Sequence, residues 1–248
     1  MRQRVMFALL MLVCALCAAL YVLPARWMIG AIPANWPLSL IDASGTLWNG
    51  QALVALGPQG AQRTLPDPIR WQWQWAWGTA PVMTIKHPWL GGPLPITPGL
   101  GSAELGAQKL RLPATALMMA GAPFNTIEPG GDVQVSWPAL RLGTRIPAGP
   151  LLQIQWNDAS SARVRVRPLG TYRAALSMTD KNLIAIKIDT LKGALRIEGS
   201  GASTPTHTLQ FQGTARPSPD ADDATRDALA PLLGMLGRRT GDITTLQY

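Results

Sequence analysis

The 248-residue chain has few cysteines, few histidines and few charged side chains. Its two cysteines, Cys14 and Cys17, lie near the N-terminus, so the rest of the chain offers neither a disulfide nor a thiol nucleophile. This absence suits an oxidising compartment, where free thiols are a liability. Charged residues make up 15% of the chain, below the roughly 25% of an average soluble domain. A disulfide-stapled miniprotein and a disordered, highly charged chain are both excluded.

One long apolar segment, Val5–Leu23, contains no charged residue. As a helix it covers ~28 Å, close to the ~30 Å hydrocarbon core of a bilayer. Tyr21 and Trp27 at its end are typical of side chains at a membrane interface. We therefore predict an uncleaved transmembrane helix over residues 5–23. A signal peptide cleaved near Ala18-Ala19 and a buried core helix are the alternatives.

The basic residues Arg2 and Arg4 precede this segment and predict its orientation. The positive-inside rule keeps residues 1–4 in the cytoplasm and places residues 24–248 across the membrane. In a bacterial inner membrane this means a single-pass protein with a periplasmic β domain. Within the span, Cys14 and Cys17 act as small hydrophobic side chains rather than as a redox pair.

The remainder of the chain is punctuated by 24 glycines and 22 prolines. Helix interiors tolerate neither residue well, so short strands and turns are expected. We predict a mainly β fold: a curved antiparallel β-sheet or flattened barrel with one or two short helices and no further domain boundary. Apolar residues alternate with a period of two, typical of strands, in Ile69–Trp77, Asp132–Trp137, Leu151–Trp156, Ala162–Arg167, Thr171–Ser177, Leu183–Ile188, Ala194–Glu198 and Thr208–Thr214.

Two segments are predicted to be helical. The first covers residues 112–120, beginning at Pro113 and ending at Gly121. The second covers residues 222–236, where Asp222 and Asp223 suit the positive end of the helix. Pro231 is expected to kink or restart this helix, and Gly237 to cap it. Its apolar stripe consists of Leu229, Leu232, Leu233 and Leu236.

Four tryptophans share one face of the predicted strand Ile69–Trp77: Trp71, Trp73, Trp75 and Trp77. Such a face most often packs in the core against a helix or a second sheet, which is our first interpretation. The alternative is a binding face, either an apolar groove open to lipid or a docking surface for another protein.

Three arginines, Arg163, Arg165 and Arg167, alternate with valines and predict a basic stripe on one strand face. A solvated face is the simpler interpretation, and acidic lipid head groups or an acidic partner protein are the alternative. The net charge of +8 is small for nucleic-acid binding, which is not expected in the periplasm.

No catalytic residue, cofactor or metal site is predicted. His87 and His207 have no Cys, His or carboxylate at ligand spacing. Gly199-Ser200-Gly201 lacks the flanking residues of a nucleophile elbow, and no glycine-rich phosphate loop is present. The chain is therefore not expected to be an enzyme.

A hairpin is expected in Ser44–Ala52, with Gly45 and Gly50 on either side of Trp48. This block resembles the G-T-L-W-x-G block of the type II secretion system protein N (GspN) family. Further segments are similar to that family in the same order along the chain. They are Pro24–Trp27, Leu112-Pro113, Pro123–Asp132 and Leu232–Arg239.

The resemblance implies an accessory component of the type II secretion system in the inner membrane. Such a component assists export of folded proteins from the periplasm across the outer membrane. It would act by protein–protein binding without catalysis, with other components of the inner-membrane platform as its partners.

The alternative is a membrane-anchored periplasmic lipid-binding or lipid-bridge protein of the LptC-like or AsmA-like kind. In that case the four tryptophans of residues 69–77 would line a groove for acyl chains. A periplasmic enzyme of unrecognised type is a third hypothesis.

Overall fold

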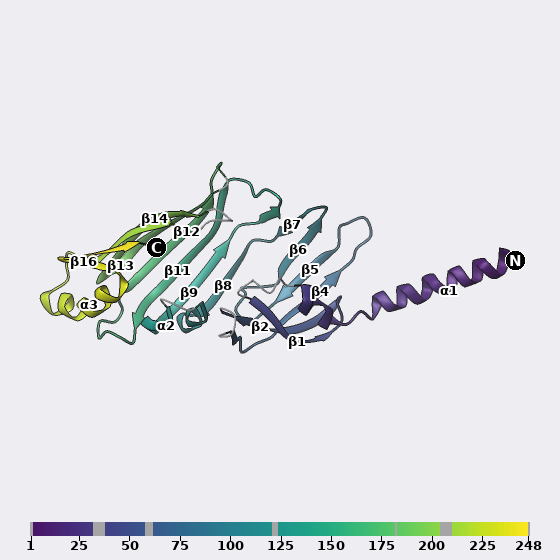
Figure 1. The fold of residues 1–248 in the computed structure, drawn as a ribbon, viewed down its shortest axis with the longest axis horizontal. Helices are drawn as coiled ribbons and strands as arrows, with labels where there is room; N and C mark the ends of the chain where they lie inside the picture. Colours follow the sequence, from purple (N-terminus) through teal and green to yellow (C-terminus); the bar gives the residue numbers. More distant parts are fainter. Residues whose placement is uncertain are drawn as a thin grey trace. The chain divides into compact units, whose positions relative to one another are not determined.

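The structure is a computed structural model that describes residues 2–31, 38–57, 62–120, 124–181, 183–203 and 210–247 (Figure 1). The chain divides into two compact units, Met1–His87 and Pro88–Tyr248, called here the N-unit and the C-unit. No domain boundary within residues 24–248 is predicted from the sequence. Each unit contains antiparallel strand pairs of its own.

The N-unit begins with helix α1, Arg2–Tyr21, followed by the 3₁₀ helix η1, Ala25–Ala31. Among the described residues, α1 is the one helix long and apolar enough to span a membrane. No part of its apolar segment is buried against the rest of the chain. The alternative of a buried core helix is therefore wrong. Cys14 and Cys17 are exposed on α1 and form no disulfide.

The strands of the N-unit pair antiparallel in the order β1-β2-β4-β5, with β3 beside β2. The predicted hairpin is confirmed, because β1 and β2 pair with Gly45 opposite Gly50. Gly45 has a φ of +86°, a conformation that favours glycine. The strands are β1 Leu38–Gly45, β2 Asn49–Leu56, β3 Arg63–Thr64, β4 Ile69–Gln74 and β5 Val82–Lys86.

The C-unit contains a short antiparallel set in the order β6-β7-β10 and a nine-stranded antiparallel sheet. The large sheet has the order β16-β17-β15-β14-β13-β12-β11-β9-β8, and Figure 1 shows its long central strands side by side. The short set is β6 Leu94–Gly99, β7 Ser102–Leu105 and β10 Leu140–Gly143. The large sheet is built from β8 Gln108–Pro113, β9 Pro129–Trp137, β11 Gly149–Ser161, β12 Gly170–Met178, β13 Ile184–Gly193, β14 Leu195–Ser203, β15 Gln210–Pro217, β16 Arg238–Thr240 and β17 Ile243–Gln247.

The predicted mainly β fold is confirmed, and the sheets are open rather than closed into a barrel. Most of the predicted strands lie within β9, β11, β12, β13 and β14. Residues 208 and 209 of the predicted strand Thr208–Thr214 lie outside the described residues, and its remainder belongs to β15. Register shifts in β11, between Trp156 and Ala159, mark a bulge that bends a strand and increases its twist.

The predicted strand Ala162–Arg167 is wrong, because these residues form a loop after β11. Apolar and charged residues alternate here although no strand forms, because Val164 is buried in the core while Arg163 and Arg165 face solvent. The chain turns at this point through a hydrogen bond from the Val164 amide to the Ser161 carbonyl, 3.5 Å long.

The first predicted helix is shorter than expected, because Leu112 and Pro113 pair with β9 as the end of β8. The helical part is the 3₁₀ helix η2, Ala114–Ala120, and Gly121 lies outside the described residues. A further short helix, α2, covers Phe124–Ile127.

The C-terminal helix is confirmed as α3, Asp223–Leu236. The carboxylate of Asp222 accepts a hydrogen bond from the Thr225 amide (2.8 Å), which satisfies a free donor of the first turn. The helix continues through Pro231 and does not restart there. Gly237 follows with extended backbone and leads into β16.

The core of the C-unit lies between α3 and the large sheet. Side chains at positions i, i+3 and i+4 of α3 meet the inward-facing residues of β14, β15 and β17. Burial of this stripe contributes to the stability of the unit. The cluster consists of Ile127, Val164, Leu169, Leu195, Phe211, Ala215, Leu229, Leu232, Leu233 and Leu246, with Leu236 packed against it.

Candidate interaction surfaces

The four tryptophans of residues 69–77 do not share one environment. Trp71 is 3% exposed, and its indole N–H donates to the Leu47 carbonyl at 3.0 Å. Trp73 is half-buried, whereas Trp75 is 65% exposed and Trp77 is fully exposed. The core interpretation is therefore wrong for Trp75 and Trp77. Strand β4 ends at Gln74, so the alternation of its faces stops before these two residues.

Trp73 and Trp75 form a cluster with Trp48, which we call the indole cluster. The ring centroids of Trp48 lie 6.3 Å from Trp73 and 5.6 Å from Trp75, and those of Trp73 and Trp75 are 6.1 Å apart. These spacings are typical of favourable aromatic pairs. The strand pairing that sets Gly50 opposite Trp71 also brings Trp48 beside Trp73. The amide of Trp73 donates to the Trp48 carbonyl at 2.8 Å.

The indole cluster is attached to the C-terminal end of α1. The indole N–H of Trp48 donates to the Leu20 carbonyl at 2.8 Å, and the Leu47 amide donates to the Leu23 carbonyl at 2.8 Å. Carbonyls in the last turn of a helix lack a partner four residues on, so Trp48 helps to satisfy one of them. Tyr21 and Trp27, close to the same end, are both exposed.

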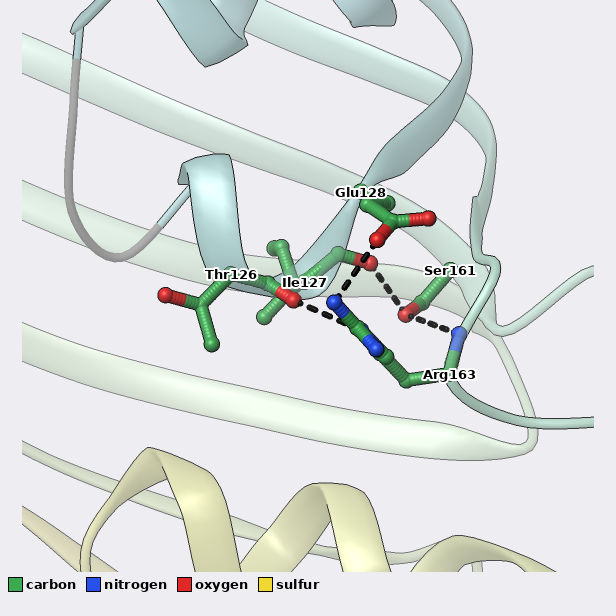
Figure 2. A network of polar contacts seen from close by, with 5 residues as sticks. All are labelled: Thr126, Ile127, Glu128, Ser161 and Arg163. Atoms are coloured by element: carbon green, nitrogen blue, oxygen red, sulfur yellow. Dashed lines mark hydrogen bonds and ion pairs between the residues drawn. The ribbon is translucent and has the colours of Figure 1, made fainter.

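The predicted basic stripe lies in the loop between β11 and β12, where Arg163, Arg165 and Arg167 are all exposed. Arg163 pairs with Glu128 at 2.7 Å and donates to the Thr126 carbonyl at 3.0 Å, as Figure 2 shows. An exposed ion pair contributes only about 0–1 kcal/mol.

The same network fixes the start of this loop, which we call the basic loop, residues 162–169. The Ser161 hydroxyl donates to the Ile127 carbonyl and accepts from the Arg163 amide (Figure 2). At its far end, the Leu169 amide donates to the Ala159 carbonyl at 2.7 Å. Hydrogen bonds therefore hold the loop at both ends. Arg163 takes part in them, whereas Arg165 and Arg167 are exposed to solvent.

The C-unit also contains a groove of about 960 Å³. It lies where residues 88–91 run beside β8, held by hydrogen bonds from the Gly91 amide to the Lys109 carbonyl and from the Arg111 amide to the Trp89 carbonyl. Sequence reasoning missed it, because its walls come from segments far apart in the chain. Its apolar lining includes Trp89, Leu90, Trp137, Leu152 and Leu176, and its basic lining is Lys109 and Arg111.

Among the described residues, no group of three or more His, Cys, Asp or Glu side chains is placed to hold a metal ion. His207 lies outside the described residues. Among the described residues, two titratable groups have shifted pKa values, each with a structural cause. Hydrogen bonds from Thr225 hold the pKa of Asp222 below its ordinary value. Burial raises the pKa of Tyr172, whose hydroxyl donates to the Leu195 carbonyl at 3.0 Å.

Comparison with known families shows to which family the chain belongs. The family model described as type II secretion system (T2SS), protein N, matches residues 37–243. The chain belongs to the type II secretion system protein N family. The resemblance seen in the sequence is thereby confirmed, and an accessory role in type II secretion follows from membership. No curated protein and no solved structure matches the chain.

The family match covers parts of both units. It begins just before β1 and ends at the start of β17, so the indole cluster, the basic loop and the groove all lie inside the T2SS protein N region. Helix α1 lies outside it. The case for a membrane anchor therefore depends on the length and composition of α1 itself, which are consistent with a single-pass protein.

Proposed function

We propose that this protein is a single-pass inner-membrane component of the type II secretion system that assists export of folded proteins by binding other components. The observation that carries the proposal is the T2SS protein N match over residues 37–243. Helix α1 would be the uncleaved anchor, with Arg2 and Arg4 on the cytoplasmic side and both units in the periplasm. The partners would be components of the inner-membrane platform.

The basic loop is the surface that we assign to a partner protein. Its backbone is held at Ser161 and Leu169, so Arg165 and Arg167 are presented from a defined position. Two cations fixed in this way suit an acidic patch, because charge complementarity steers association and sets specificity. Little conformational entropy is lost when a loop that is already held in place binds.

The test is an export assay in a bacterium that uses this protein. The gene is deleted, and the exported enzymes are measured in the medium and in the periplasm. The full chain should restore export, whereas the charge reversal Arg165→Glu with Arg167→Glu should restore it poorly. Arg141→Glu, an exposed arginine on β10 of the same unit, is the matched control and should behave like the natural chain. Unchanged export after deletion would contradict the proposal.

The lipid-bridge function is the second candidate, and the apolar groove with Lys109 and Arg111 on its wall is the feature that favours it. A groove of this lining would accept an acyl chain and an anionic head group. Family membership favours secretion. Normal export in the deletion strain, together with phospholipid that copurifies with the full chain, would instead support the lipid-bridge function.

A further inference from the structure

We propose that the exposed tryptophans of the N-unit dock this unit on the bilayer surface at the C-terminal end of α1. The inference rests on the proposed membrane anchor and goes beyond it. An anchor joined by a free linker would let the following domain leave the bilayer surface. Here, the geometry points to an aromatic surface that holds the N-unit on the lipid head groups.

The first argument is continuity with α1. The predicted membrane span, residues 5–23, covers ~28 Å, close to the thickness of the hydrocarbon core, so Leu20 in α1 lies within one helical turn of the boundary of that core. The Trp48 indole donates to the Leu20 carbonyl at 2.8 Å. The indole cluster therefore lies at the depth of the head groups, the layer in which tryptophan and tyrosine are enriched.

The second argument is the exposure of aromatic side chains around this point. Trp75 contacts Trp48 through its ring yet is mostly exposed, and Trp77 lies fully exposed on the turn after β4. The segment from residue 75 to residue 81 contains no charged side chain. Trp27, on η1 shortly after the end of α1, is exposed as well.

The bilayer is the medium that we expect to cover these exposed rings. Contiguous exposed aromatics mark a surface that meets something other than water. The indole combines an apolar body with an N–H donor, and the head-group layer offers both an apolar and a hydrogen-bonding environment. Because the cluster is bonded to the anchor itself, the occupant nearest to it is the bilayer. The exposed Arg26 next to Trp27 suits the phosphates of the same layer.

The experiment uses the full chain in vesicles of phosphatidylethanolamine and phosphatidylglycerol. The acyl chains carry bromine either at carbons 6 and 7 or at carbons 11 and 12, and quenching of tryptophan fluorescence is measured. We expect stronger quenching by the shallow bromines. Trp77→Ala should lose part of the shallow quenching without a loss of folding, because Trp77 is fully exposed. Trp75→Leu, which also alters the indole cluster, should lose a further part.

The matched control is Trp156→Phe in the C-unit, where the ring packs against Tyr172 and is half-buried. It should leave the quenched intensity unchanged. Sedimentation with the vesicles after a carbonate wash tests the anchor separately: a chain that washes off contradicts the proposed anchor. A chain that stays bound, but whose shallow quenching is the same with Trp77→Ala, overturns the docking inference. Crosslinks in cells from position 77 to protein alone would also overturn it.

Discussion

The two units of the chain differ in where their largest apolar side chains lie. In the C-unit, α3 covers the sheet, and Leu229, Leu232 and Leu233 are buried against it. In the N-unit, Leu40, Leu65 and Trp71 are buried, while Trp75 and Trp77 face outward. The C-unit thus buries the apolar side chains of α3 in its own core. The N-unit instead exposes aromatic side chains that can contact a medium other than water.

The two units also differ in the kinds of side chain that they expose. Exposed features of the C-unit include Arg165 and Arg167 in the basic loop and a groove with basic walls. Those of the N-unit are indoles joined to an apolar helix. Electrostatic complementarity suits a protein partner, and an aromatic belt suits a bilayer. Substitutions in each unit sharpen this contrast, and the largest effect is expected within β4.

Replacement of the buried tryptophan should have the largest effect. Trp71→Ala should lower the free energy of unfolding of the N-unit by roughly 3–5 kcal/mol, because it leaves a large cavity and an unpaired Leu47 carbonyl. Trp77→Ala in the same segment should change it by less than about 0.5 kcal/mol. Hydrogen exchange of the β2 and β4 amides measures both. Equal effects would remove the distinction between core and surface tryptophans.

The second prediction concerns α3. Leu233→Ala should destabilise the C-unit by about 2–5 kcal/mol, since this fully buried leucine lies at the centre of the core. Met235→Ala on the exposed side of the same helix is the control and should have little effect. Urea denaturation, followed by exchange of the β14 and β15 amides, gives both values. If Leu233→Ala were tolerated, the C-unit would not depend on α3 for its core.

The third prediction concerns the hairpin of the N-unit. A Cβ at Gly50 would lie 2.6 Å from Cζ2 of Trp71 and 2.8 Å from the Ser44 carbonyl. Gly50→Val should therefore lower the free energy of unfolding of the N-unit by about 1–3 kcal/mol through overpacking. The cause would be this close contact rather than strain in the turn.

The control for this glycine lies in α3. Gly234→Ala has open space around its Cβ and should stabilise the C-unit by up to about 1 kcal/mol through helix propensity. Thermal unfolding of the two variants should shift in opposite directions. Equal shifts would contradict the close packing of Gly50 on Trp71.

The smallest effect is expected at the N-cap of α3. Because the pKa of Asp222 is lowered in the folded chain, its charged form stabilises α3 at a pH above the ordinary pKa of aspartate, about 3.9. This stabilisation is lost as the pH falls through the lowered pKa. Asp222→Asn keeps a hydrogen-bond acceptor without the charge. Urea denaturation should show a stability difference at pH 6 that shrinks towards pH 3, whereas a difference independent of pH would contradict the assignment.

Local patterns predicted α3 and the central strands well. The N-cap Asp222 and the leucine stripe lie in one short stretch, and β9, β11 and β12 carry clear alternation. Alternation failed where it continued past the end of a strand. The alternation of residues 69–77 continues to Trp75 and Trp77, although β4 ends at Gln74. The basic loop also shows alternation, but there Val164 is buried in the core without being part of a strand.

Contacts between distant segments account for most of what the sequence could not predict. Leu112 looked like a helix start because Pro113 follows it, but pairing of these two residues with Val133 and Asp132 makes them the end of β8. The strand β5, Val82–Lys86, is half-buried on both faces and shows no alternation. The bond from Trp48 to Leu20 joins residues 28 positions apart, so no local pattern reveals the attachment of the indole cluster to α1.

The most direct test of the account is photocrosslinking in living cells from two positions, Trp77 in the N-unit and Arg165 in the C-unit, followed by mass spectrometry. The account predicts phospholipid adducts from position 77 and adducts with an inner-membrane component of the secretion system from position 165. Protein adducts from position 77, together with lipid adducts from position 165, would contradict the division of roles between the two units.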